Sequence, residues 1–370
     1  MVLSIISFTE NGMALSEKIA RTVGETDTIK EFDIIEEFLP IEVRQFTKCT
    51  TCFADGQEFS IQFVKNSIGD WAKEQMEDRN VLFFIGACGI AVRAIAPCLT
   101  DKLHDSPVLV ADEKGQYLIP ILSGHVGGAN ALASWIAEKI GAEPVITTAT
   151  DLNRKFAVDL FAKKNGLFIV NRDGIAKVSA KVLSGQTISM SVETGHLEVH
   201  GKQPDGIHIL PYPPAQQVDV MVTSEEKEWD AAILLKPREY VIGMGCRRGK
   251  EAEQIDDFIR RHLEKFGIVP GQVVELASID RKRNEPGLLA WSRKERIPFR
   301  TYTAEELQSV KGTFQTSDFV QNQVGVDNVC ERAALKSCEP MGTLVYEKHA
   351  ENGMTIAIAK REWKVKFGEI

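Results

Sequence analysis

Apolar runs alternate repeatedly with amphipathic segments along the chain, and this alternation predicts an α/β fold. VLSIIS (2–7) is typical of a strand and NGMALSEKIARTVG (11–24) of a helix. VLFFIG (81–86) predicts a buried strand. A glycine turn then leads into the short helix ACGIAVRAIAP (87–97), which ends at a proline.

The same strand–turn–helix order recurs further along. PVLVAD (107–112) and YLIPILS (117–123) are predicted strands on either side of the turn EKGQ. The glycine-rich stretch SGHVGGAN then leads into the helix ANALASWIAEKIGA (129–142) and the strand PVITTATD (144–151). We therefore expect residues 1–150 to form an amino-terminal α/β domain.

Residues 151–237 follow a different pattern. Two helical stretches (154–170 and 173–186) enclose a short strand, and three further strands are joined by polar, proline-rich turns such as LPYPPAQ. This pattern predicts a small α+β middle module.

Residues 238–370 are expected to form a carboxy-terminal α/β domain. It opens with a strand, a glycine turn and an amphipathic helix (238–267), and two more helices are predicted at 285–296 and 328–337. GTLVYEKHAENGMTIAIAKR (342–361) predicts a hairpin with the turn ENG. The fold class is therefore α/β and multidomain, with two α/β domains flanking a small α+β middle module.

Composition narrows the classes of function. The chain has 370 residues, 44% of them hydrophobic and 26% charged, which is typical of a globular protein of two or three domains. Its net charge of −8 argues against general nucleic-acid binding, which needs a basic field. No apolar run is long enough to cross a membrane, and the first residues lack the features of a signal peptide. We therefore expect a cytoplasmic protein.

Three glycine turns are candidate binding elements: IGACGIAVR (85–93), LSGHVGGAN (122–130) and GMGCRRGKE (243–251). In open α/β sheets such turns lie at the carboxyl ends of strands, and the helix starts that follow them favour anions. Each turn alone is equally well explained as a structural connection that ends a strand and begins a helix. Together they predict an anion-binding cleft between the domains.

The third turn adds the cations Arg247, Arg248 and Lys250. Arginine forks match carboxylates or phosphates, although a solvated basic patch is the alternative explanation. Arg93 could contribute similarly from the first domain.

His125 can act as a general base at neutral pH, because its ordinary pKa is about 6.5. Ser123 lies two residues away, but LSGHVGG is not the G-x-S-x-G nucleophile elbow. A histidine in a turn can equally be structural. Asp112 and Asp151, near strand ends, are candidate carboxylates, with capping or turn formation as the alternative.

Seven cysteines, an odd number, fit reduced thiols better than a disulfide framework. Cys49 and Cys52 have C-x-x-C spacing, but no second pair or spaced histidine pair completes a zinc site. We therefore expect ordinary free thiols and no metal site.

FFIGACGIAVRAIAP, LSGHVGGANALA and VITTATD together resemble the amino-terminal part of the cobalt-precorrin-5A hydrolase family (CbiG) of anaerobic cobalamin biosynthesis. GMGCRRGKE, EPGLLAWSRKERIPF, SDFVQNQVGVDNVCERAAL and GMTIAIAKR resemble its carboxy-terminal module, which also occurs as a separate small protein, CobE, in the aerobic pathway. The resemblance covers about residues 1–150 and 238–365 and is only architectural between them.

The resemblance implies that the δ-lactone on ring A of cobalt-precorrin-5A is opened and that acetaldehyde leaves, giving cobalt-precorrin-5B. Cobalt comes with the substrate, so no cofactor of the protein's own is implied. We expect a cobalt-corrinoid as the partner, with transient handover to neighbouring pathway enzymes and with no nucleic acid or membrane. Formation of a homo-oligomer stays open.

Lactone opening needs an activated water and stabilisation of a developing oxyanion. We infer that His125 activates the water or delivers a proton in the carbon–carbon cleavage, with Ser123 as a second catalytic candidate. Backbone N–H groups around Gly127 and Gly128 would stabilise the oxyanion. The predicted substrate-binding residues are Gly86, Cys88, Gly89, Arg93, Gly124, Gly127, Gly128, Asn130, Asp151, Gly245, Arg247 and Arg248.

Two other classes of function stay open. The chain could be a non-catalytic tetrapyrrole-binding or handover protein of the same pathway, which binding without turnover by residues 238–370 alone would support. A nucleotide-dependent enzyme ranks last, because neither G-x-x-x-x-G-K-[ST] nor G-x-G-x-x-G occurs.

Overall fold

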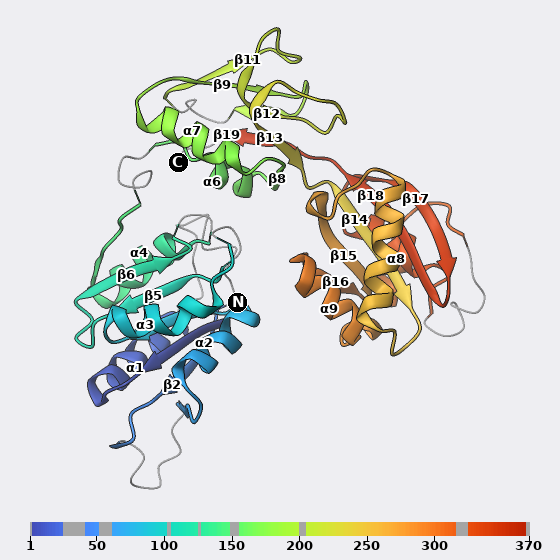
Figure 1. Ribbon diagram of the computed structural model, residues 1–370. Helices are drawn as coiled ribbons and strands as arrows, with labels where there is room; N and C mark the ends of the chain where they lie inside the picture. Colours follow the sequence, from blue (N-terminus) through green and yellow to red (C-terminus); the bar gives the residue numbers. More distant parts are fainter. Residues whose placement is uncertain are drawn as a thin grey trace. The chain divides into compact units, whose positions relative to one another are not determined.

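Two compact units make up the chain, Met1–Lys155 (unit 1) and Phe156–Ile370 (unit 2). The computed structural model describes residues 2–24, 41–51, 61–101, 105–124, 127–148, 155–199, 205–315 and 325–367 (Figure 1). Within these ranges, no helix combines the length and the apolar character needed to span a bilayer.

Unit 1 is built on a seven-stranded sheet in the order β3-β2-β1-β4-β5-β6-β7. Its strands are β1 (Val2–Ser7), β2 (Glu42–Thr47), β3 (Gln62–Phe63), β4 (Val81–Ile85), β5 (Val108–Ala111), β6 (Tyr117–Leu122) and β7 (Glu143–Pro144). The helices are α1 (Glu10–Gly24), α2 (Ile68–Glu77), α3 (Cys88–Ile95) with the 3₁₀ turn η3 (Ala96–Cys98), and α4 (Ala129–Ile140). Strands β1 to β5 run parallel, and β6 runs antiparallel to β5.

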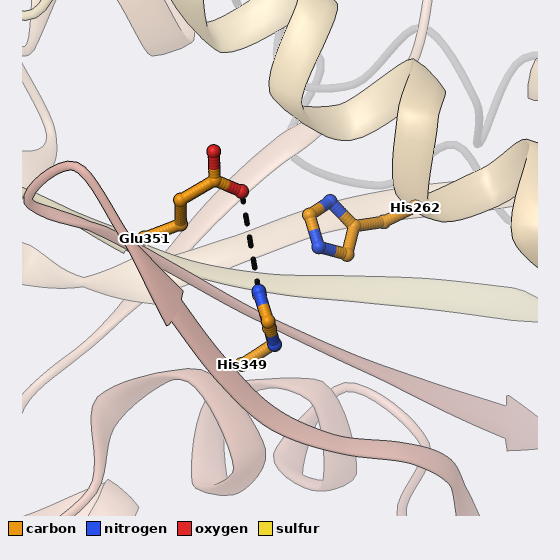
Figure 2. Close-up of side chains that lie close together, drawn as sticks. All are labelled: His262, His349 and Glu351. Carbon is orange, nitrogen blue, oxygen red and sulfur yellow. Dashed lines mark ion pairs between the residues drawn. The ribbon is translucent and has the colours of Figure 1, made fainter.

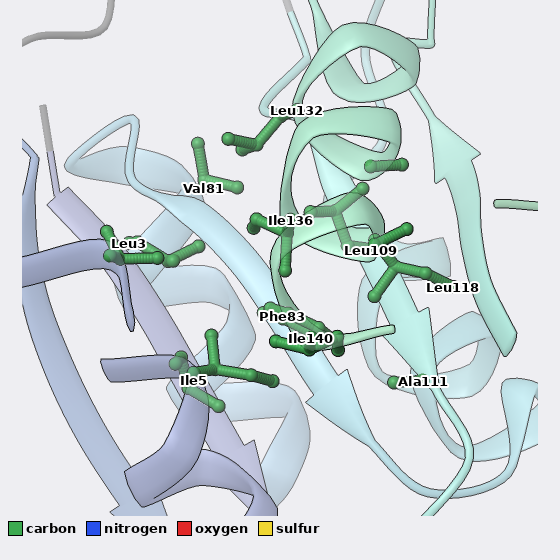
Figure 3. Packing of buried hydrophobic residues seen from close by; sticks show 14 of the residues in the cluster. Leu3, Ile5, Val81, Phe83, Leu109, Ala111, Leu118, Leu132, Ile136 and Ile140 are labelled. Carbon is green, nitrogen blue, oxygen red and sulfur yellow. The ribbon is translucent and has the colours of Figure 1, made fainter. Parts of the chain in front are cut away.

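Apolar side chains cover both faces of this sheet, as the near-continuous hydrophobic strands require. On one face, α1 and α4 pack against the strands, and Figure 3 shows Leu132, Ile136 and Ile140 of α4 beside Phe83 and Leu109. On the other face, α2 and α3 cover a second cluster that includes Trp71 and Phe84. The sheet is therefore the middle layer of a three-layer unit, in agreement with the predicted α/β fold class.

Most elements predicted in this unit are present, but the strand expected at 144–151 is wrong. Strand β7 is confined to Glu143–Pro144, residues 145–148 are irregular, and residues 149–151 lie outside the described ranges. The direction of β6 also matters for the site. The tight turn after β5 joins two neighbouring strands, and so short a connection permits only an antiparallel pair.

Unit 2 holds two five-stranded sheets. The first has the order β11-β9-β12-β13-β8 and carries α6 (Val158–Lys164) and α7 (Asp173–Leu183). Its strands are β8 (Leu167–Ile169), β9 (Ile188–Val192), β11 (Ile207–Leu210), β12 (Val218–Val222) and β13 (Ala231–Pro237). This α+β sheet occupies the predicted middle module, although the sequence pattern did not predict β11 or β13.

The second sheet has the order β16-β15-β14-β18-β17. Its strands are β14 (Tyr240–Cys246), β15 (Val273–Ile279), β16 (Phe299–Tyr302), β17 (Gly342–Glu351) and β18 (Met354–Arg361). One face packs on α8 (Ala252–Lys265) and α9 (Pro286–Glu295), and the other packs on α10 (Ala304–Gln308) and α12 (Val329–Lys336). The 3₁₀ turns η4 (Pro270–Gln272) and η5 (Asp280–Lys282) flank β15.

The predicted hairpin of β17 and β18 is confirmed, and its two-residue turn is Asn352-Gly353. Both residues have positive φ (49° and 75°), which Asn-Gly adopts readily. After β18 the chain leaves this sheet. Its last described strand, β19 (Val365–Phe367), pairs with β10 (Leu197–Val199) beside the first sheet of unit 2 (Figure 1). The ring of Trp363 stacks on that of His196, with centroids 3.9 Å apart, and this contact stabilises the pairing of β19 with β10.

Candidate functional site

The predicted turn with the densest positive charge connects β14 to α8, and we name residues 246–251 the basic turn. It lies at the carboxyl ends of the parallel strands β14 and β15, as predicted for a ligand-binding turn. Arg247 and Arg248 are exposed, and neither guanidinium forms an ion pair within the described ranges. The turn therefore presents two exposed guanidiniums a few residues before α8 begins.

Three contacts hold the basic turn in place. Arg247 N donates to the carbonyl of Gly353 at the hairpin turn (2.8 Å), and Gly249 N donates to Glu285 Oε1 (2.7 Å). A Cβ on Gly287 would lie 2.5 Å from the carbonyl oxygen of Lys250, so the start of α9 approaches the turn closely. The arginines therefore extend from a fixed backbone.

Glu285 is the buried carboxylate that organises this edge of the sheet. Burial alone would raise its pKa, but hydrogen bonds from Lys282 Nζ (2.7 Å) and Gly249 N outweigh burial and lower it. The carboxylate is thus ionised at neutral pH and compensates part of the local positive charge.

We expect Glu285→Gln to lower the melting temperature at neutral pH by roughly 3–6 °C, because a charge-assisted hydrogen bond contributes about 1.5–3 kcal/mol. A lowered folded-state pKa stabilises the fold above the ordinary value of 4.5, and that stability is lost as the pH falls through the folded-state pKa. The difference between the two proteins should therefore shrink in acid. Thermal unfolding followed from pH 7 to about pH 3 measures it, and parallel curves would contradict this role.

Gly245, a predicted binding residue, and its neighbour Cys246 have structural explanations. A Cβ on Gly245 would lie 2.6 Å from Thr355 Oγ1 on the neighbouring strand. Burial raises the pKa of the Cys246 thiol, with Lys282 partly opposing it, so the group stays a neutral thiol. None of the six cysteines in the described ranges forms a disulfide bond.

In unit 1, residues 123–124 and 127–130 make close contacts around their glycines. Ser123 has φ of 53°, and a Cβ on Gly127 would lie 2.5 Å from the Ser123 carbonyl oxygen. Gly128 has φ of 83° and precedes α4. A Cβ on Gly124 would lie 2.4 Å from Asn130 Oδ1. Local sterics or backbone conformation therefore explain why glycine occupies each of these positions.

Two residues predicted to act in this loop, Asn130 and Ser123, have hydrogen-bond partners within the protein. The N–H of Asn130, expected to point at the substrate, donates instead to the Gly124 carbonyl at 2.8 Å, and its side-chain amide donates to Thr148 Oγ1 at 3.0 Å. The Ser123 hydroxyl donates to the Asp105 carbonyl at 2.7 Å, which favours a structural role over a catalytic one. His125 and Asp151 lie outside the described ranges.

The first glycine turn lies at the opposite edge of the unit 1 sheet from this loop. Ile85 pairs with Ala111 and Ala111 with Leu118, whereas Leu122 pairs with Val108. The ends of β4 and β6 are therefore three residue steps apart along the strands, about 10 Å. Gly86, whose N–H donates to the Ala111 carbonyl (2.8 Å), and Cys88 follow the end of β4. Because β6 is antiparallel to β5, the first two glycine turns leave the unit 1 sheet at opposite ends of its strands.

The remaining candidates in the first turn are parts of α3. Arg93 is exposed, and its guanidinium approaches the carbonyl of Gly89 in the same helix (3.4 Å).

Asp112, predicted as a candidate carboxylate, follows β5. It accepts hydrogen bonds from the N–H groups of Lys114, Gln116 and Tyr117, so turn formation accounts for this carboxylate.

Unit 2 contains a second cationic feature, a cavity of about 330 Å³ that the sequence pattern did not predict. Burial lowers the pKa of its arginines, Arg238 and Arg361, and neither guanidinium forms an ion pair in the described part of the chain. Antiparallel pairing of β14 with β18 brings these two residues together, so no local motif could have marked them. The lining residues are Asn165, Gly166, Glu198, Arg238, Arg361, Glu362, Trp363, Lys364 and Lys366.

Comparisons with known proteins cover both units. The family model described as Cobalamin synthesis G N-terminal matches residues 70–151, and the model described as Cobalamin synthesis G C-terminus matches residues 240–359. A Salmonella typhimurium protein named cobalt-precorrin-5A hydrolase is 32% identical over 96% of this chain and 97% of its own length.

Two further relatives match either nearly the whole chain or about one third of it. A Priestia megaterium protein, also named cobalt-precorrin-5A hydrolase, is 30% identical over 96% of this chain and 94% of its own length. Protein CobE of Sinorhizobium sp is 30% identical over 32% of this chain and 78% of its own length. With two family models matching more than half of its residues and full-length relatives at this identity, the chain belongs to the cobalamin synthesis G (CbiG) family.

Proposed function

We propose that this protein is a cobalt-precorrin-5A hydrolase that opens the ring A δ-lactone with release of acetaldehyde and formation of cobalt-precorrin-5B. One water enters and one acetaldehyde leaves. The observation that carries the proposal is similarity, over nearly the full length, to two relatives that bear this name. Cobalt enters with the substrate, so the proposed reaction needs no cofactor from the protein.

The basic turn supports binding of such a substrate. A corrinoid intermediate carries acetate and propionate groups around its ring, and Arg247 and Arg248 are exposed guanidiniums on a fixed backbone. Arginine binds carboxylates through two parallel hydrogen bonds, and the start of α8 adds a favourable dipole. The cavity with Arg238 and Arg361 offers a second place for a carboxylate.

The chemical step is proposed for the loop in unit 1. His125 would accept a proton from the attacking water or deliver one in the carbon–carbon cleavage. N–H groups around Gly127 and Gly128 would stabilise the developing oxyanion. The contacts of Ser123 and Asn130 anchor both ends of this loop, which is what a positioned base requires.

Anaerobic incubation of the full chain with cobalt-precorrin-5A tests the proposal, with mass spectrometry of the corrinoid and trapping of acetaldehyde. We expect a corrinoid that has gained water and lost acetaldehyde. Recovery of unchanged cobalt-precorrin-5A bound to the protein would instead support the second candidate, a corrinoid handover protein, which the CobE relative favours for the carboxy-terminal part.

Arg248→Gln is expected to raise the KM for cobalt-precorrin-5A about tenfold and to leave kcat nearly unchanged. An interaction made equally in the ground state and the transition state changes only KM, and a tenfold change corresponds to about 1.4 kcal/mol. Arg44→Gln, which removes an equal charge from an exposed ion pair on β2, is the matched control. An unchanged KM in Arg248→Gln would exclude the basic turn as a carboxylate site.

A further inference from the structure

Two histidines and a glutamate from distant parts of the sequence meet on one surface of unit 2. His262 projects from α8, and His349 and Glu351 project from β17 (Figure 2). One nitrogen or oxygen atom from each side chain lies within 4.8 Å of the other two. His349 and Glu351 are two positions apart on a strand, a spacing that places both on the same face.

The hydrogen bond of His262 prepares it to bind a metal ion. Its Nδ1 lies 2.6 Å from the carbonyl oxygen of Phe258. Because a carbonyl only accepts, Nδ1 carries the proton and Nε2 keeps its lone pair. Metal-binding histidines are commonly oriented by such a bond from the other ring nitrogen.

We propose that His262, His349 and Glu351 form a binding site for a divalent first-row transition-metal ion of the zinc type. Two imidazole nitrogens and one carboxylate oxygen suit such ions, whereas Mg²⁺ and Ca²⁺ prefer oxygen ligands throughout. Three protein ligands leave a fourth position for water or an external ligand. The inference does not depend on the proposed reaction.

Arg261 would compete with a metal ion for the carboxylate of Glu351. Its guanidinium contacts both Glu351 oxygens (3.2 and 3.4 Å) and also pairs with Asp257 (3.0 Å). It is half-exposed, so it can release Glu351 and keep Asp257. Metal loading thus exchanges one partner of the Glu351 carboxylate for another.

A bound ion would join the last turns of α8 to the end of β17, beside the hairpin turn. The Gly353 carbonyl in that turn accepts from Arg247 N, so the ion would also stabilise a neighbour of the basic turn. Because the ion binds only the folded arrangement, it raises the stability of unit 2 by mass action.

Calorimetric titration of the EDTA-treated full chain with Zn²⁺ tests the site, with Co²⁺ as a spectroscopic probe. We expect one equivalent of Zn²⁺ to bind, a higher melting temperature, and visible Co²⁺ absorption bands from the mixed nitrogen and oxygen ligands. His349→Ala and Glu351→Gln should each weaken binding by about 100-fold, because loss of even an outer partner of a metal site costs 10–100-fold. Arg261→Gln should tighten binding.

His208→Ala, which removes an exposed histidine on β11, is the control and should bind Zn²⁺ as the unchanged protein does. His349 and Glu351 are not buried, so their variants should fold even if the buried His262→Ala does not. Absence of Zn²⁺ binding, or equal affinity in His349→Ala, Glu351→Gln and the unchanged protein, would overturn the proposal.

Discussion

His125→Ala is expected to lower the rate of acetaldehyde release at least 100-fold and to leave binding of cobalt-precorrin-5A unchanged. General acid–base catalysis contributes about 10²–10⁴-fold, and the proposal gives this proton transfer to His125 alone. In the proposed function, Arg247 and Arg248 rather than His125 bind the substrate's carboxylates, so we expect the affinity to survive the substitution. Single-turnover measurement of acetaldehyde beside corrinoid titration separates the two effects.

The control for His125→Ala is His208→Ala, which removes a histidine outside the proposed site. Equal melting temperatures for the three proteins would show that the loop still folds. If His125→Ala releases acetaldehyde at the parent rate, the histidine is not catalytic, and the 123–130 loop is a binding element.

Gly243→Ala is expected to destabilise unit 2 by at least about 3 kcal/mol, the upper range for overpacking a core. Gly243 lies in β14, and a Cβ there would be 1.8 Å from the Cys330 carbonyl oxygen and 2.9 Å from Ala334 N. Both atoms belong to the backbone of α12, so no side-chain rotation can relieve the clash. Because β14 leads directly into the basic turn, substrate binding should fall as well.

Denaturant unfolding followed by circular dichroism measures the change. Gly24→Ala is the comparison, because a Cβ at the end of α1 would have no atom within 4 Å. We expect that variant to differ by less than about 0.5 kcal/mol from the unchanged protein. An unshifted unfolding transition for Gly243→Ala would refute the close approach of β14 and α12.

Local sequence pattern was sufficient where a segment forms its structure by itself. The helix α8 and the β17–β18 hairpin follow from residue spacing and from the Asn-Gly turn. Strand partners were less accessible, because a strand's sequence does not state which neighbour it pairs with. Thus the pairing of β10 with β19 and the position of β18 between β14 and β17 had no local signal.

In the candidate site, too, residues that are adjacent in the sequence could be predicted, whereas residues brought together by the fold could not. The cations of the basic turn are adjacent in the sequence, whereas Glu285, which holds that turn, lies on another element. The antiparallel direction of β6 separated two turns that the strand–turn–helix pattern had grouped together. His262 and His349 lie far apart along the chain, so their meeting depends on the packing of α8 against the hairpin.

The number of turnovers distinguishes catalysis from binding of the corrinoid alone. Cobalt-precorrin-5A is supplied in large excess over the full chain under anaerobic conditions, and acetaldehyde is counted per protein molecule over time. We expect many equivalents of acetaldehyde per protein molecule, released at a rate proportional to protein concentration. No acetaldehyde above the protein-free control, or release that stops at one equivalent, would contradict it and identify a corrinoid carrier instead.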